Sequence, residues 1–236
     1  MALAPDWGWI NSMAAAPHAD ALSAGRKREQ GSGMSIVLYD LCGANDARFS
    51  PYCWRVKMAL AHKGLAFESR PVPFTKIPTI ADGAQKTVPV IDDDGRLVRD
   101  SFDIAVYLEQ AYPDRPSLFG GAGGLAAARF IETWSRVVVH MGLTGLIVAD
   151  VHSVLQDVDD RYFRESREKR LGRTLEAAQS GREDRLEAFR ASLAPARMTL
   201  EVQPFLGGST PLFTDYILFG ALQWARATSP LQVLAD

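Results

Sequence analysis

The chain has 236 residues, a formal net charge of −2 at pH 7 and hydrophobic residues at 47% of its positions. Such a chain buries a sizeable core in one or two globular domains, which excludes disordered and fibrous proteins. Its near-neutral charge and lack of a basic stripe exclude a nucleic-acid partner, and no run of about 18 apolar residues predicts a membrane span. A soluble enzyme that acts on small molecules remains.

The cysteine count and the N-terminal composition indicate where the protein works. Cys42 and Cys53 are too few for a disulfide framework and are typical of a reducing compartment, so we expect a cytoplasmic protein. Residues 1–33 lack the basic start and the long apolar centre of a signal peptide. We interpret them as a poorly ordered N-terminal extension; a docking arm is the alternative.

The first regular segment predicts a strand, a helix and a second strand. Residues 35–40 are apolar and rich in β-forming residues, and a helical pattern follows over residues 51–63. Ser50 occupies the N-cap position, Pro51 the first helical position, and Gly64 ends the helix. Residues 67–72 read as a second strand, which is parallel to the first if the helix is the crossover between them.

A hairpin and a second helix are predicted next. Residues 88–92 and 96–99 flank Asp93, Asp94 and Gly95, a tight-turn sequence. Ser101 then caps a helix that extends to about residue 111. The order is therefore βαβ followed by ββα.

The second half of the chain has a different pattern. After the glycine-rich residues 120–124 the strand signals end, and helical periodicity with charged stretches continues to the C-terminus. We predict an α/β domain over residues 34–119 and an all-helical domain over residues 125–236. Residues 162–190 are rich in Arg and Glu, which is typical of an exposed helical arm.

Ser50 is the first candidate for chemistry. It follows a strand at the start of a helix, where backbone N–H groups and the helix dipole stabilise an anion. A hydroxyl there can donate to a bound thiolate and lower the thiol pKa, so the nucleophile would belong to the ligand. The alternative is that Ser50 only caps the helix.

Two further candidates lie at the ends of neighbouring strands. Val88 precedes Pro89 at a strand start, and a cis bond there would offer the Val88 backbone groups to an extended peptide; an ordinary trans proline is the alternative. Asp100 suits an α-amino group and Ser101 a carboxylate, although both also suit a helix cap. Together with Ser50 they complement the thiol, the backbone and the γ-glutamyl end of one ligand.

These residues carry a family resemblance. SPYCWRVKMAL, TVPVIDDDG and RDSFDIAVYLEQAYP within residues 36–112, and LFTDYILFG at residues 212–220, resemble soluble glutathione transferases. The resemblance implies a thioredoxin-like domain followed by a helical domain with the second-substrate pocket. It also implies glutathione as co-substrate, Ser50 as the thiolate-stabilising hydroxyl, Val88 before a cis Pro89, Asp100 and Ser101 on the γ-glutamyl group, and a homodimer.

Further segments indicate a subfamily. SPYCWRVKMALAHKG, YPDRPSLF, SREKRLGRTLE and SGREDRL are similar to bacterial glutathione-dependent β-etherases, in which the glutathione thiolate attacks the carbon that bears an aryloxy group. Two departures stand out. Leu212 replaces the Ser or Thr that caps the core helix in many members, and β-etherases continue through further helices after the position of Asp236. We therefore expect a truncated helical domain with an unburied apolar face around Leu218 and Trp224.

Other residues are assigned no chemistry. Cys53 makes the SPYC segment similar to a redox CPYC motif, but Ser50 replaces the nucleophilic thiol. His140 lacks a partner at metal-ligand spacing, so we predict no metal. Four basic residues are interpreted as part of a solvated helical face rather than as contacts to an anionic substrate: Arg164, Arg167, Lys169 and Arg170.

Three functions follow. The first is a β-etherase-like glutathione transferase that attacks an aromatic or other hydrophobic electrophile. The second is a glutathione-dependent isomerase or dehalogenase, because SPYCWRV also resembles zeta-type isomerases. The third, from another class, is a catalytically silent binding or regulatory protein with the same fold.

Overall fold

The computed structural model of the protein describes residues 36–234. The predicted N-terminal extension, residues 1–33, lies outside the described residues. In the N-terminal half the regular elements are β1 Ile36–Leu41, η1 Ala44–Asp46, α3 Pro51–His62, β2 Phe67–Val72, η2 Phe74–Thr79, β3 Val90–Asp93, β4 Arg96–Arg99 and α4 Ser101–Ala111.

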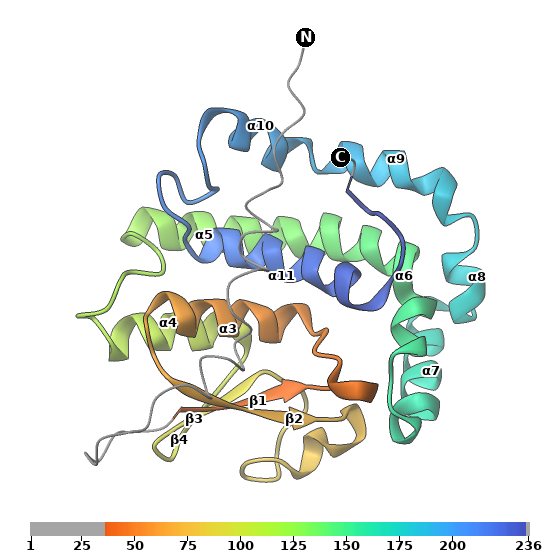
Figure 1. Cartoon of the computed structure of the whole chain (residues 1–236), viewed down its shortest axis with the longest axis horizontal. Helices are drawn as coiled ribbons and strands as arrows, with labels where there is room; N and C mark the ends of the chain where they lie inside the picture. The colour runs from red at the N-terminus through yellow and green to blue at the C-terminus, as the bar shows by residue number, and fades with distance from the viewer. Residues whose placement is uncertain (1–35, 235–236) are drawn as a thin grey trace.

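These strands form a four-stranded mixed sheet in the order β2-β1-β3-β4. β1 and β2 are parallel, as the βαβ pattern predicts, and β3 runs antiparallel to both β1 and β4. The hairpin turn places Asp94 and Gly95 at positive φ, which the predicted Asp-Gly turn requires. α3 and α4 lie between the sheet and the long helices of the C-terminal half (Figure 1), and this half has a thioredoxin-like fold.

One helix start differs from its prediction. Asp100, rather than Ser101, is the N-cap of α4, because its carboxylate accepts from the backbone N–H groups of Phe102 at 2.8 Å and Asp103 at 3.3 Å. Ser101 is the first helical residue instead. Asp100 has φ +67°, an unusual conformation for a residue with a side chain.

The C-terminal half is helical. Its elements are α5 Ala122–Trp134, η3 Ser135–His140, α6 Met141–Ser153, α7 Asp157–Leu171, α8 Leu175–Gln179, α9 Arg182–Ser192, α10 Ala194–Val202 and α11 Phe213–Thr228. α5 begins inside the glycine-rich segment, residues 120–124, that was predicted to separate the two domains. η3 is a π-helical turn that joins α5 and α6 into one continuous helix.

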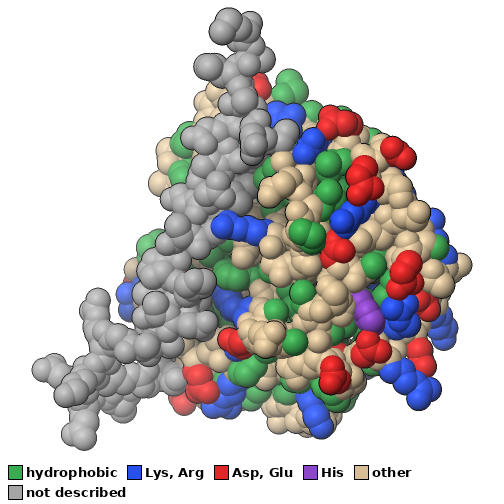
Figure 2. Space-filling model, turned by 45° about the vertical axis from the view of Figure 1, so that its right-hand side comes forward, with side chains coloured by type: hydrophobic (Ala, Val, Ile, Leu, Met, Phe, Trp, Pro, Cys, Tyr) green, Lys and Arg blue, Asp and Glu red, His purple; other side chains and the backbone are tan. Residues whose placement is uncertain are grey.

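The expectation that no segment could span a membrane is wrong for this continuous helix, Ala122–Ser153. Its length and apolar composition are sufficient for one, but 44% of its most apolar stretch is buried inside the protein. Leu143, Leu146 and Ile147 belong to the helical core, as expected for a core helix of a globular domain. On the face shown in Figure 2, acidic and basic side chains are interspersed.

α11 is the central helix of the molecule, and the expectation of an unburied face on it is wrong. Leu218 is fully buried and Trp224 is half-buried, because α11 lies between α3 and the α5–α6 helix (Figure 1). α3 and α11 approach closely at Gly220, where an added Cβ would lie 2.3 Å from the Pro51 carbonyl oxygen. The helical core therefore packs directly against the helix that begins at Ser50.

The start of α11 is stabilised without a Ser or Thr cap. The Asp215 carboxylate accepts from the backbone N–H groups of Leu206 at 2.7 Å, Gly207 at 2.9 Å and Leu212 at 2.9 Å. Leu212 has no side-chain acceptor to return a bond, so only one half of a capping box is formed. Asp215 is fully buried and fixes the preceding loop on the helix.

Candidate active site

The loop that leads into α3 is held in place by a cluster of buried charged side chains. Asp40, at 1% exposure, pairs with Lys57 Nζ at 2.6 Å and with Arg48 Nη1 at 2.9 Å. The Arg48 carbonyl accepts from Trp54 Nε1 at 2.8 Å. These bonds tie the loop to β1 and to α3, and thereby fix the position of Ser50.

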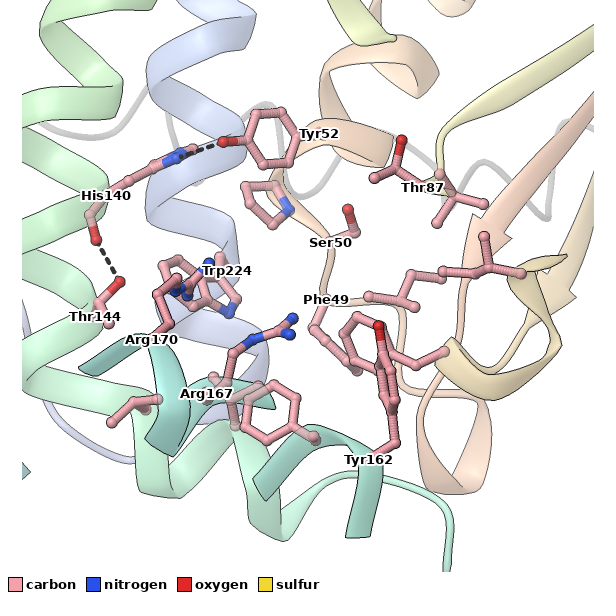
Figure 3. A pocket seen from close by; sticks show the side chains of 18 of the residues that line it. Phe49, Ser50, Tyr52, Thr87, His140, Thr144, Tyr162, Arg167, Arg170 and Trp224 are labelled. Atoms are coloured by element: carbon pink, nitrogen blue, oxygen red, sulfur yellow. Dashed lines mark hydrogen bonds between the residues drawn. The ribbon is translucent and has the colours of Figure 1, made fainter. Parts of the chain in front are cut away.

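Ser50 is the N-cap of α3, as predicted. Its Oγ accepts from the backbone N–H of Cys53 at 3.2 Å, so the hydroxyl keeps its own proton for a second partner. The side chain is buried and faces a pocket between the two halves of the chain (Figure 3). An acceptor atom placed there meets both the Ser50 hydroxyl and the positive end of the α3 dipole.

The other predicted binding residues occupy two places. Val88 lines the same pocket as Ser50, and the Val88–Pro89 peptide bond is cis, as the family resemblance implies. Asp100 and Ser101 are not among the pocket-lining residues; they lie together at the start of α4, beyond β3 and β4. The structure thus brings Ser50 and Val88 together and leaves Asp100 and Ser101 as a neighbouring polar pair.

That polar pair has unused hydrogen-bonding capacity. Ser101 is 1% exposed, and its Oγ has no hydrogen-bond partner among the described residues. Asp100 uses one carboxylate oxygen, Oδ1, for the α4 cap. Arg55, on α3, is fully buried and lies within electrostatic reach of Asp100, which links this pair to the site helix.

The pocket has a volume of about 780 Å³ and lies between the two halves of the chain. One wall is aromatic: Phe74 packs against Phe49, Tyr162 and Phe163 with ring centroids 5.7 to 6.2 Å apart. α7 carries part of this wall and is fixed to η2 by Asp159. The buried Asp159 carboxylate accepts from the backbone N–H groups of Phe74 and Thr75, both at 2.8 Å.

A histidine and a tyrosine meet on the opposite wall. Tyr52 Oη and His140 Nδ1 are 3.2 Å apart, and Thr144 Oγ1 donates to the His140 carbonyl at 2.7 Å (Figure 3). Burial, followed by the charge of Arg55, lowers the pKa of His140 to about 3. His140 is therefore neutral near pH 7. It ends the π-helical turn η3, a feature often found at functional sites.

Arg167 and Arg170 also line the pocket, in contrast to their interpretation as a solvated face. Arg167 extends from α7 into the space between the walls (Figure 3). Its guanidinium lies 4.7 Å from the Phe163 ring centroid and 5.2 Å from that of Phe74. The charge pattern of the α7 sequence is the same for a solvated helix and for a pocket wall, so only the packing of α7 distinguishes them.

Comparison with known proteins places the two halves in one family. The family model described as the glutathione S-transferase N-terminal domain matches residues 45–116, and the one described as the C-terminal domain matches residues 126–232. The chain belongs to the glutathione S-transferase family. These two matches cover both walls of the pocket.

Three relatives illustrate the relationship. Glutathione transferase GSTFuA3 from Phanerochaete chrysosporium is 30% identical over 82% of this chain and 85% of that chain, with a TM-score of 0.74. A glutathione S-transferase of Ceriporiopsis subvermispora, solved in complex with glutathione, is 25% identical over 83% of this chain and 87% of that chain, with a TM-score of 0.72. Maleylacetoacetate isomerase of Dictyostelium discoideum is 31% identical over 88 residues, 32% of this chain and 38% of its own length.

Several side chains that line the pocket were not predicted from the sequence. Tyr52 lies in the SPYC segment, and its place beside Ser50 is the sequence feature that could have identified it as a pocket residue. Thr87, Trp224 and the aromatic wall come from separate elements and carry no local signal. Cys53 is fully buried, and burial raises its thiol pKa, which argues against thiol exchange at SPYC.

Proposed function

We propose that this chain is a glutathione transferase that binds glutathione with its sulfur at Ser50 and adds the thiolate to a hydrophobic or aromatic electrophile. The observation that carries the proposal is the Ser50 hydroxyl, which is fixed by the α3 cap and faces the pocket. A hydrogen bond to the sulfur, together with the α3 dipole, favours the ionised form and lowers the thiol pKa. The thiolate, rather than the thiol, is the nucleophile.

The chain's polar groups fit glutathione. The free Ser101 Oγ and the N-terminus of α4 suit the γ-glutamyl carboxylate, and the second oxygen of Asp100 suits its ammonium group. The Val88 backbone suits the cysteinyl peptide group. A relative solved in complex with glutathione supports this assignment.

The finer proposal is β-aryl ether cleavage. The thiolate would form a carbon–sulfur bond at the carbon that bears an aryloxy group, the carbon–oxygen bond would break, and the aryloxide would leave with the bonding pair and take up a proton. The aromatic wall around Phe74 supports a substrate with aromatic rings. Holding the sulfur and the carbon at attack distance is the contribution of the pocket.

A second candidate is glutathione-dependent isomerisation. The local match to maleylacetoacetate isomerase favours it. An isomerase returns free glutathione, whereas a transferase yields a thioether, so mass spectrometry of the products distinguishes the two. Dehalogenation would yield halide, and a binding or regulatory relative would yield no product.

The carrying observation is tested by two matched serine variants. Ser50→Ala is expected to raise the pKa of bound glutathione, seen as loss of the ultraviolet thiolate band, with a smaller change in Kd by calorimetry. Ser101→Ala is expected to weaken the Kd and leave the thiol pKa unchanged. Because losing the Ser50 N-cap costs about 0.5–2 kcal/mol, Ser50→Ala needs thermal melting as a folding control, and Ser101→Ala, which removes a buried hydroxyl at the first residue of α4, is melted alongside it. An unchanged thiol pKa in Ser50→Ala contradicts the assigned role.

We further propose that the protein is cytoplasmic and forms a homodimer. Cys42 and Cys53 are unpaired, which supports a reducing compartment. Phe130 and Val137, two helical turns apart on α5 and η3, are 70% and 55% exposed, which supports an apolar interface there. Cell fractionation tests the first proposal and sedimentation equilibrium the second.

A further inference from the structure

The wall of the pocket formed by α7 carries positive charge that no carboxylate neutralises. Within residues 36–234, neither Arg167 nor Arg170 forms an ion pair, and Arg167 Nη1 donates to the neutral Ser166 Oγ at 3.0 Å. Arg164, one turn earlier on the same helix, pairs with both Glu168 and Glu176 at 2.9 Å. Of the α7 arginines, Arg161 and Arg164 lie outside the pocket and are paired with glutamates, whereas the two that line the pocket form no ion pair among the described residues.

Arg167 is held in this position by aromatic rings. Its guanidinium lies over the rings of Phe163 and Phe74, and its side chain is half-buried. Burial and the neighbouring charge of Arg170 lower the pKa of Arg167, so its surroundings disfavour an isolated cation. A partly desolvated cation is stabilised most by an anion that reaches it, and a guanidinium matches the two oxygens of a carboxylate.

We propose that Arg167 and Arg170 form an anion subsite and that the second substrate is an aromatic carboxylate, its ring against Phe74 and its carboxylate on the two guanidinium groups. The proposal rests on the proposed glutathione transferase function and adds the chemical class of the electrophile. It joins two properties of one wall, aromatic rings and unpaired guanidinium groups. A neutral electrophile would contact the aromatic rings and leave the guanidinium groups unpaired.

Glutathione is the other source of a carboxylate. The residues that fit it, from Ser50 to Ser101, all lie on the thioredoxin-like half, whereas Arg167 and Arg170 lie on α7 of the helical half. We therefore assign the subsite to the second substrate. Binding of glutathione alone separates the two sources.

The probes are two conjugates that differ in one charge. They are S-(4-carboxy-2-nitrophenyl)glutathione and its carboxamide, S-(4-carbamoyl-2-nitrophenyl)glutathione, measured by calorimetry on the full chain with glutathione alone as reference. Neither measurement requires turnover. A second assay follows thioether formation from 4-chloro-3-nitrobenzoate and from its carboxamide, in which the carbon–sulfur bond forms and chloride leaves with its bonding pair. These rates are normalised to the uncatalysed reactions.

We expect the wild type to bind the carboxylate conjugate about tenfold more tightly than the carboxamide, the effect of one charge-assisted hydrogen bond. Arg167→Gln is expected to abolish this preference and leave the Kd of glutathione unchanged. Arg170→Gln, at an exposed position, reduces the preference and serves if Arg167→Gln does not fold. Lys169→Gln removes the same charge from α7 outside the pocket and keeps the preference.

Equal affinity of the wild type for the two conjugates would overturn the anion subsite, while tight binding of both would leave the transferase function standing. An equal loss for both conjugates in Arg167→Gln would show a structural role only. Weaker binding of glutathione alone in that variant would assign the subsite to glutathione. If neither conjugate nor glutathione binds the wild type, the proposed function fails together with the subsite.

Discussion

His140 illustrates how one side chain acquires its properties from three elements. It ends η3, contacts Tyr52 of α3 and packs edge-on against Trp224 of α11 with ring centroids 6.0 Å apart. Its Nε2 is buried without a hydrogen-bond partner among residues 36–234. Protonation would place a second cation near Arg55 in a desolvated site, which is why its pKa is lowered to about 3.

The consequence is a pH-dependent stability. In the unfolded chain a histidine has its ordinary pKa near 6.5, so below that pH the unfolded state binds more protons and the free energy of unfolding falls. The decline attributable to His140 is up to about 1.4 kcal/mol per pH unit from about pH 6.5 downward. His62, whose pKa is lowered chiefly by burial, contributes in the same direction.

The measurement is urea unfolding between about pH 5 and 7. His140→Gln removes the titrating group and is expected to show a shallower decline than the wild type, with His62 and the other titrating groups contributing equally to both proteins. The comparison uses slopes, so any constant loss of packing in the variant cancels. Identical slopes for the two proteins would contradict a depressed His140 pKa.

Among the elements, α7 is docked onto η2 by Asp159 in its first turn. The fully buried Asp159 accepts from the backbone N–H groups of Phe74 and Thr75 and from Thr75 Oγ1 at 2.9 Å, and so docks α7 onto η2. The docking brings Tyr162 and Arg167 of α7 into the pocket. A charged helix that looks solvent-exposed in the sequence thus becomes a pocket wall.

Asp159→Asn is expected to lower the free energy of unfolding by about 1–3 kcal/mol, because one of the three bonds loses its acceptor and the others lose a charged partner. Asp157→Asn, at an exposed position in the same turn, removes the same charge from the helix N-terminus and corrects for the dipole effect. Urea unfolding of both variants gives the difference. A cost no greater than that of Asp157→Asn would contradict the docking role.

At the scale of the whole molecule, the apolar side chains that stay exposed point to a second copy of the chain. Phe130 on α5 is 70% exposed and Val137 on η3 is 55% exposed, whereas Leu143 and Leu146, further along the same continuous helix, are buried. Met198, on α10, is 66% exposed on a different element. The proposed homodimer would cover the first pair.

Phe130→Glu is therefore expected to shift the protein from dimer to monomer, since a carboxylate buried in an apolar interface is strongly unfavourable. Met198→Glu carries the same change of charge and leaves the dimer intact. Sedimentation equilibrium over a range of concentrations reports the mass of each. A monomeric wild type, or an unchanged dimer in Phe130→Glu, would remove this interface from consideration.

Local signals in the sequence determined the thioredoxin-like half almost completely. The Ser50-Pro51 start of α3, the Asp94-Gly95 turn and the alternation of short apolar runs act over a few residues, because caps, turns and strand patterns are short-range effects. The same signals placed Ser50 at the helix cap, whereas the cis Val88–Pro89 bond was implied only by the family resemblance, because the residues alone also allow a trans proline. These signals misplaced the cap of α4 by one residue, because Asp100 and Ser101 are both side chains that can cap a helix.

The tertiary structure alone decided which faces of the helical half are buried and which line the pocket. Helical periodicity does not tell which neighbour covers a face, so the burial of Leu218 and the pocket position of Arg167 did not follow from it. The aromatic wall brings Phe49 and Phe74 against Tyr162 and Phe163. Such contacts are set by packing between distant segments, and they define the pocket that we propose for the second substrate.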